Sequence, residues 1–163
     1  MTEWRVLGTP ELVELFGRLR TLEWSWRLDD VAQLATEFGW KIERSRPNWV
    51  VLDIGFGRGS GEVSGDDGVA DEIVLEVTSS ATDDAAGRSR SRAAFAEMTA
   101  ALTAEFGAPT KKVPGVTPEV RWAGVATTTV LRDLGVSVAL RLVTNEKLAT
   151  EDAIEELDEQ GLL

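Results

Sequence analysis

Residues 40–78 read WKIERSRPNWVVLDIGFGRGSGEVSGDDGVADEIVLEVT. Apolar and polar residues alternate on both sides of a glycine-rich centre, and this period of two is typical of half-buried strands. Pro47-Asn48 and the glycines separate the apolar runs, as turn residues do. We therefore predict three antiparallel strands, over residues 40–46, 49–56 and 71–78.

Helical patterns lie before and after this region. Three segments place apolar residues three or four positions apart, and two of them are followed directly by a glycine that can end a helix. Thr9-Pro10 and Asp29-Asp30 supply capping side chains at two of the starts. We predict helices over residues 10–22, 29–38 and 92–106. The small, polar segment 79–91 is predicted to be a flexible loop.

The second half of the chain repeats the order of the first. LATEFG at residues 34–39 and LTAEFG at residues 102–107 each end a predicted helix, at an offset of 68 residues. Further alternating segments after the second motif predict strands over residues 119–122, 127–133 and 136–143. The repetition indicates two similar α-β-β-β units, from a duplication or from chance reuse of one stop signal.

The fold class that follows is α+β. We expect a single domain over residues 1–163, with antiparallel sheet or sheets covered by helices on one face. Residues 150–163 are dominated by Asp and Glu. Leu148, Ile154 and Leu157 favour a short helix against the body, whereas the charge favours a disordered tail.

Composition excludes several classes of function. The chain has no cysteine and no histidine, so thiol ligands, histidine bases and the usual nucleophile-histidine triads are absent. The formal net charge of -11 repels phosphate backbones and anionic membranes. No signal peptide or membrane span is evident, so we expect a cytoplasmic protein. The negative charge indicates a basic protein partner. We expect no cofactor and no metal.

The motifs with chemical potential have simpler interpretations. Residues 55–61, GFGRGSG, lack the following helix that a phosphate-binding loop requires, so we interpret them as a mobile hairpin loop. Asp66, Asp67, Asp71 and Glu72 do not have the spacing of a calcium loop. Asp53, and Glu119 with Arg121, alternate with apolar neighbours and are predicted to lie on the solvent face of the sheet.

Candidate contact residues for a protein partner follow from loop position, charge and aromatic character. Tryptophan is enriched at interfaces, and mobile loops and acidic turns are accessible. The alternative for Trp24 and Trp26 is burial in the hydrophobic core. The candidates are Trp24, Gly57, Arg58, Gly59, Asp66 and Asp67.

Five segments in order carry a resemblance to a family of small actinobacterial proteins. They are WSW at 24–26, LATEFGW at 34–40, LDIGFG at 52–57, PEVRW at 118–122 and VALRLVTN at 138–145. The chain resembles the family that includes the immunity factor for tuberculosis necrotizing toxin, an NAD glycohydrolase. The resemblance implies a cytoplasmic antitoxin that binds the toxin domain in a one-to-one complex and blocks its NAD-binding site.

Two other functions stay open. A cytoplasmic chaperone or adaptor for a secreted protein would bind an unfolded segment instead of a folded enzyme. A small enzyme without histidine would depend on carboxylates, and would hold two acids with raised pKa in a deep pocket.

Overall fold

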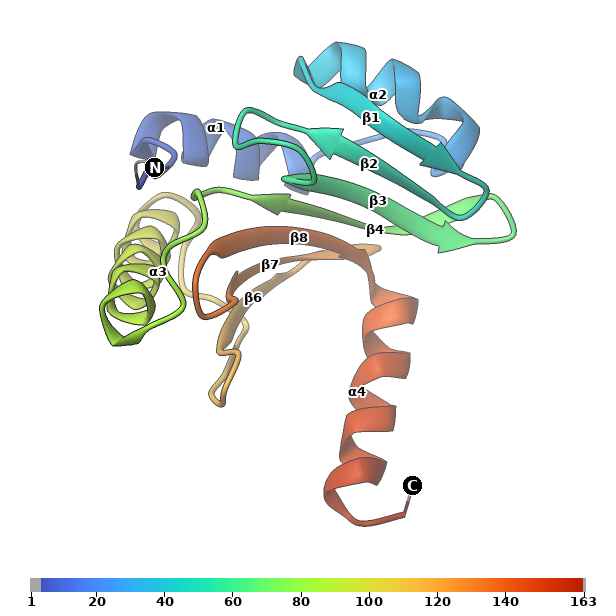
Figure 1. The fold of residues 1–163 in the computed structure, drawn as a ribbon. Helices are drawn as coiled ribbons and strands as arrows, with labels where there is room; N and C mark the ends of the chain where they lie inside the picture. The colour runs from blue at the N-terminus through green and yellow to red at the C-terminus, as the bar shows by residue number, and fades with distance from the viewer. Residues whose placement is uncertain (1–3, 163) are drawn as a thin grey trace.

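A computed structural model describes residues 4–162, and within this range eight strands form one antiparallel sheet in the order β1-β2-β3-β4-β8-β7-β6-β5. The strands are β1 (Lys41–Arg46), β2 (Trp49–Asp53), β3 (Gly61–Asp66), β4 (Val69–Glu76), β5 (Lys111–Val113), β6 (Glu119–Ala123), β7 (Thr127–Asp133) and β8 (Val138–Thr144). The helices are α1 (Thr9–Arg20), α2 (Val31–Phe38), α3 (Ala85–Phe106) and α4 (Asn145–Glu159), with a 3₁₀ turn, Leu28–Asp30, before α2. The predicted α+β class is confirmed (Figure 1).

The two halves of the chain are two four-stranded meanders. Strands β1 to β4 follow α2, strands β5 to β8 follow α3, and the halves join where β4 pairs with β8. Each strand of the second half begins 66 to 70 residues after its counterpart in the first. The predicted repeat is therefore present in one continuous sheet, with four strands in each unit instead of three.

The additional strands lie where the sequence indicated loops. β3 occupies the glycine-rich stretch, and β5 occupies a segment close to several prolines. The glycines of β3 are needed for packing. A Cβ on Gly61 would lie 2.7 Å from Ile54 Cγ2, and one on Gly65 would overlap the backbone of Val69. Glycine in a strand often marks such a close approach. Residues 55–60 form the predicted hairpin loop, but the chain from Gly61 to Asp66 is a strand that the sequence did not indicate.

Two predicted helix starts are also corrected. α3 begins at Ala85, because the Asp84 carboxylate caps it by accepting a 2.8 Å hydrogen bond from the Gly87 N–H. Much of the expected flexible loop is therefore helix, and its polar residues concealed the periodicity. α1 starts at Thr9 itself, with Gly8 in the cap position and no side-chain cap. Gly39 ends α2 in the left-handed conformation, as predicted.

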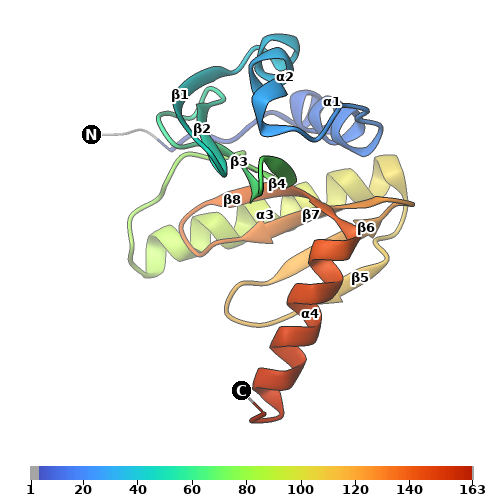
Figure 2. The same ribbon diagram turned by 90° about the vertical axis from the view of Figure 1, so that its right-hand side faces the viewer.

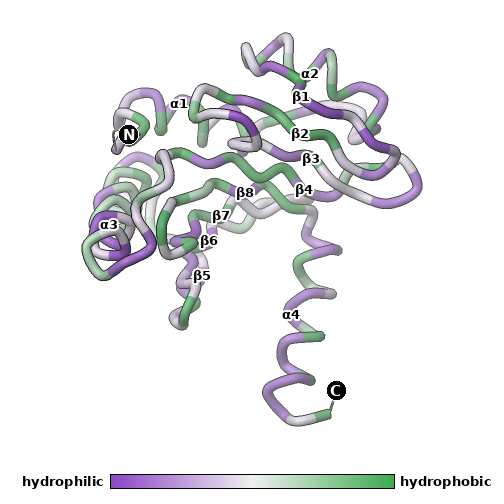
Figure 3. The backbone as a smooth tube through the Cα atoms, viewed as in Figure 1, coloured by the Kyte–Doolittle hydropathy of each residue, from purple (hydrophilic) through white to green (hydrophobic). Residues whose placement is uncertain are grey.

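The main core lies between one face of the sheet and helices α1, α2 and α3. Inward side chains of both halves meet there in a single cluster. The central strands that supply many of them are among the most hydrophobic segments of the chain (Figure 3). Trp122 packs edge-on against Phe16 with ring centroids 5.1 Å apart, and its indole N–H donates to Gly107 O. The fully buried residues of this cluster include Phe16, Leu52, Ile73, Leu102, Leu131 and Leu140.

Helix α4 lies on the opposite face of the sheet. Its Leu148 packs against Val130 and Val143 in a second, small cluster. Beyond Asp152 the helix extends away from the sheet, and its last turn lies far from the core (Figures 1 and 2). No helix within residues 4–162 is both long and apolar enough to cross a membrane.

Two glycine substitutions test the packing of β3. Gly65→Ala places a Cβ 1.8 Å from Val69 O, so we expect the free energy of unfolding to fall by about 2 kcal/mol or more. Gly17→Ala in α1 meets the Phe106 ring at an ordinary 3.6 Å and should stabilise the protein by about 0.5–1 kcal/mol. Urea unfolding followed by tryptophan fluorescence measures both changes. Equal effects of the two substitutions would contradict the packing of β3.

Candidate functional site

A row of side chains crosses the sheet on the face opposite the core. Cross-strand register places Glu62 beside Val74, Val74 beside Arg141, Arg141 beside Val130, and Val130 beside Arg121. Both arginines are flanked along their strands by core residues, so alternation directs them to this face. They lie under the first turns of α4.

Arg141 joins three elements. Its Nε donates to Glu72 on β4 at 2.6 Å, and its Nη2 donates to both carboxylate oxygens of Glu151 on α4 at 2.8 and 2.9 Å. The residue is only 4% exposed. Burial by itself lowers the pKa of Arg141, but the hydrogen bonds and charges of Glu151 and Glu72 outweigh it and hold the pKa above its ordinary value.

Arg121 makes the matching connection from β6. Its two terminal nitrogens donate to Asp152 on α4 at 2.7 and 2.8 Å, while its Nε donates to Glu119. Arg132 donates to the other oxygen of Glu119 at 3.0 Å. The hydrogen bond with Asp152 contributes most to raising the pKa of Arg121, and the same bond lowers the pKa of Asp152.

The expected solvent-face position of Glu119 and Arg121 is wrong, because each is only 7% exposed. Alternation correctly predicted that they face away from the core. It did not reveal that α4 covers that face. Asp53, which was predicted to face solvent, is half-buried and accepts hydrogen bonds from the Gly55 and Gly57 N–H groups at 2.8 and 3.2 Å.

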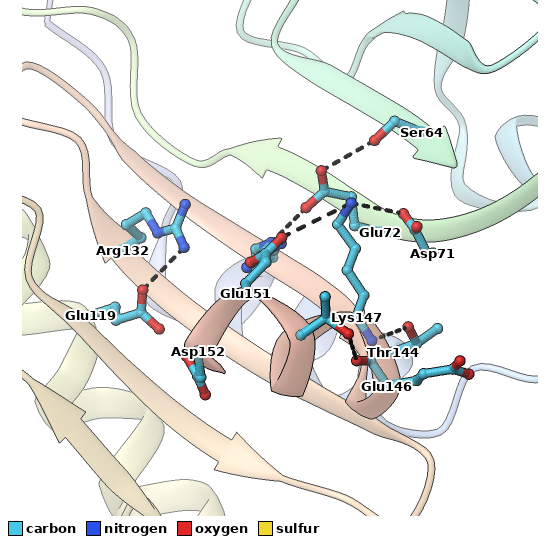
Figure 4. Close-up of polar contacts among 12 residues, drawn as sticks. Ser64, Asp71, Glu72, Glu119, Arg132, Thr144, Glu146, Lys147, Glu151 and Asp152 are labelled. Carbon is cyan, nitrogen blue, oxygen red and sulfur yellow. Dashed lines mark hydrogen bonds and ion pairs between the residues drawn. The ribbon is translucent and has the colours of Figure 1, made fainter. Parts of the chain in front are cut away.

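The first half of α4, residues 145–152, is held by contacts with the sheet. Its outer half, residues 153–159, is exposed. Thr144 caps the helix by accepting from the Lys147 N–H, and Lys147 Nζ lies 3.4 Å from Asp71 and 3.9 Å from Glu151 (Figure 4). Leu148 is its one buried residue. Residues 153–162 are all exposed. The acidic segment is thus helical as far as Glu159, and the helix is docked through its first half alone.

A groove runs between α4 and the β3–β4 hairpin, with a volume of about 500 Å³. We call it the α4 groove. Val69 and Ile154 present apolar side chains to it and are 54% and 51% exposed. Polar residues that line it include Asp66, Asp71, Lys147 and Thr150.

The structure does not bring the predicted contact residues together. Gly57, Arg58 and Gly59 lie in the β2–β3 loop, where Arg58 Nε is 3.5 Å from Glu43. Asp66 and Asp67 are at the other end of β3, and Asp66 lines the α4 groove.

Trp24 lies in a third place, between α1 and α2. Its ring is 5.3 Å from that of Trp26 and packs against the main core. It also lines a small pocket with Asp30 and Glu37, and its buried indole N–H has no hydrogen-bond partner within the described part of the chain. Of the predicted residues, only Asp66 lines the α4 groove.

Sequence reasoning placed Arg121 on the solvent face, did not single out Arg141, and did not predict that the C-terminal helix covers both. A signal was present, since each arginine stands in a strand between apolar residues, in VRW and ALRLV. A charge so placed needs a partner when buried. The acidic residues after Thr144 were the available partners.

The comparisons with known proteins place the chain in a family. Residues 10–144 match the model of DUF6301, a family of unknown function, and the chain therefore belongs to that family. No curated protein and no solved structure matches significantly. The matched region ends at Thr144, so it includes Arg121 and Arg141 but not α4.

The Arg121–Asp152 pair makes a pH-dependent contribution to stability. Because the folded-state pKa of Asp152 is lowered, the stabilisation is complete above the ordinary value of 3.8 and is lost as pH falls through the folded-state pKa. We expect Asp152→Asn to lower the free energy of unfolding by about 1 kcal/mol at pH 7, a modest value because the partly exposed carboxylate is screened by water.

Chemical denaturation between pH 7 and pH 3 measures this difference, which should shrink as the pH falls. Asp158→Asn, at an exposed position of the same helix, is the matched control and should leave stability unchanged at each pH. A difference between wild type and Asp152→Asn that persists unchanged at the lowest pH would contradict the role of the pair.

Proposed function

We propose that this protein is an antitoxin, a protein inhibitor that binds an NAD-glycohydrolase toxin domain in the cytoplasm and blocks its NAD-binding site. The observation that carries the proposal is the outer half of α4. It projects from the sheet as an exposed acidic helix on a base held by two buried arginines.

The charge of this projection suits the proposed partner. A site that binds NAD accommodates a diphosphate, and cationic groups favour such an anion. Residues 153–159 present four carboxylates, from Glu155, Glu156, Asp158 and Glu159, and no cation. An acidic helix is therefore complementary to a dinucleotide cleft and would also speed association with it.

The rigid base of α4 favours inhibition by obstruction. A segment that is ordered before binding loses little conformational entropy in the complex. Thr144, Lys147 and the two arginine contacts fix the direction of the helix before any partner arrives. An inhibitor of this kind needs surface complementarity and no reaction chemistry.

The alternative of a carboxylate-based enzyme has weaker support. Burial raises the pKa of Glu76, and Ser137 donates a 3.2 Å hydrogen bond to it. Nearby Asp133 accepts hydrogen bonds from Ser91 and from the Gly135 N–H. These acids are engaged with neighbouring turns of the same fold, which is the arrangement expected for structural residues.

A chaperone or adaptor for a secreted protein is the second candidate. The half of the open sheet face that α4 leaves uncovered has a depression of about 410 Å³, lined by Arg44, Trp49 and Val51, among others. A half-buried aromatic beside the edge strand β1 suits an extended segment. Binding to an unfolded segment, and not to a folded toxin, would favour this candidate.

Mixing experiments test the antitoxin proposal. The purified toxin domain should lose NAD hydrolysis when this protein is added in equimolar amount. Asp158→Asn combined with Glu159→Gln removes two charges from the projection, and we expect inhibition to weaken by about tenfold, mainly through slower association. A fluorogenic NAD analogue measures the residual rate.

The matched control removes two exposed charges from α3 instead, by Glu97→Gln and Glu105→Gln. This variant should inhibit like the wild type. NAD hydrolysis at the full rate with the wild-type protein in excess would disprove the antitoxin function, and equal weakening in both variants would disprove the role of α4.

A further inference from the structure

The α4 groove has two rigid walls. On one side, the β3–β4 hairpin is held by hydrogen bonds from the Leu28 N–H to Gly68 O and from the Ala70 N–H to Trp26 O, at 2.9 and 2.7 Å. On the other side, Arg141 and Lys147 hold α4 through Glu151. A groove with both walls fixed is already in a conformation suited to binding.

Exposed apolar side chains face this space from both walls. Val69 and Ile154 line the groove and are each more than half exposed, and Leu157, one turn further along α4, is 40% exposed. An apolar side chain inserted between Val69 and Ile154 would remove the surface of both from water. Apolar anchors enclosed by polar residues are typical of the centre of a protein interface.

The polar residues around the apolar centre select the charge of the occupant. Four carboxylates line the groove, from Asp66, Asp71, Glu146 and Glu151, with Lys147 as the one cation. The Lys147 ammonium already lies close to Asp71 and Glu151. The rim therefore keeps surplus negative charge, and flanking Lys or Arg side chains of a partner would neutralise it.

The same charge disfavours a second copy that docks through its own α4. Two such copies would bring the carboxylates of both helices together, and like charges across an interface oppose association. The net charge of -11 adds a general repulsion between copies. A partner of opposite sign has neither disadvantage.

We propose that the α4 groove binds a cationic amphipathic segment of the partner protein, with an apolar side chain between Val69 and Ile154 and flanking Lys or Arg side chains on the carboxylates. This inference rests on the proposed antitoxin function and identifies where the toxin domain would be held while the end of α4 enters its cleft.

A synthetic helix-forming peptide with a central leucine flanked by lysines is the probe. Its binding to the full-length protein is measured by fluorescence anisotropy, beside two companion peptides, one with glutamates in place of the lysines and one with serine in place of the leucine. Ile154→Ser should weaken binding of the first peptide by about tenfold, since the apolar contact is lost. Both companion peptides should bind the wild type weakly.

Val116→Ser is the matched control, because Val116 is fully exposed in the β5–β6 loop and does not line the groove. It should bind the first peptide as the wild type does. Equal affinity of wild type, Ile154→Ser and Val116→Ser would overturn the inference. So would concentration-dependent self-association in sedimentation that Ile154→Ser abolishes, since a second copy would then be the occupant.

The failures of the two proposals are distinguishable with the toxin domain. If the wild type leaves NAD hydrolysis unchanged but binds the peptide through Ile154, the antitoxin function is wrong. The groove is then a binding site for a different cationic partner. If the wild type inhibits the toxin and Ile154→Ser inhibits it equally well, the groove is not the contact and the antitoxin function stands.

Discussion

The pairing of two buried arginines with the acidic first half of α4 is the constraint on which the position of this helix depends. Arg121 and Arg141 are almost inaccessible to water, and a charge in that position is strongly destabilising unless it is neutralised and hydrogen-bonded. Glu119 and Glu72 supply one partner each from the sheet, and Asp152 and Glu151 supply the other from α4. The position of the helix follows from these contacts.

Apolar burial plays a small part in holding α4. Leu148 is the one side chain of this helix that reaches the second cluster, whereas α1 and α3 each place several residues in the main core. The Arg121–Asp152 pair fixes direction well, because the two terminal guanidinium nitrogens donate to the two carboxylate oxygens, and few orientations allow both bonds. Ion pairs of this kind add less net stability than their number indicates. The structure thus combines a stable sheet with a helix whose direction is set by charge.

The match to the family model ends where the sheet ends and α4 begins. The matched region covers the sheet and the helices of the main core and stops at the residue that caps α4. Arg121 and Arg141 lie inside that region, so the sheet supplies the cationic half of the contact and α4 the anionic half. Because only Leu148 of this helix is buried, its exposed part can differ in charge and length without disturbing the core.

The sequence alone determined the class of the fold, most of the strands and the ends of α2 and α3, because local periodicity and glycine stops are properties of neighbouring residues. The repeat of the two halves was also visible in LATEFG and LTAEFG. Local patterns did not identify β3, since its glycines are there for close packing against Leu52, Ile54 and Val69. The α4 groove and the burial of Arg121 and Arg141 depend on contacts between residues far apart in the chain, such as Glu72 with Arg141. Only the tertiary structure decided them, because alternation says which face a side chain takes but not what covers that face.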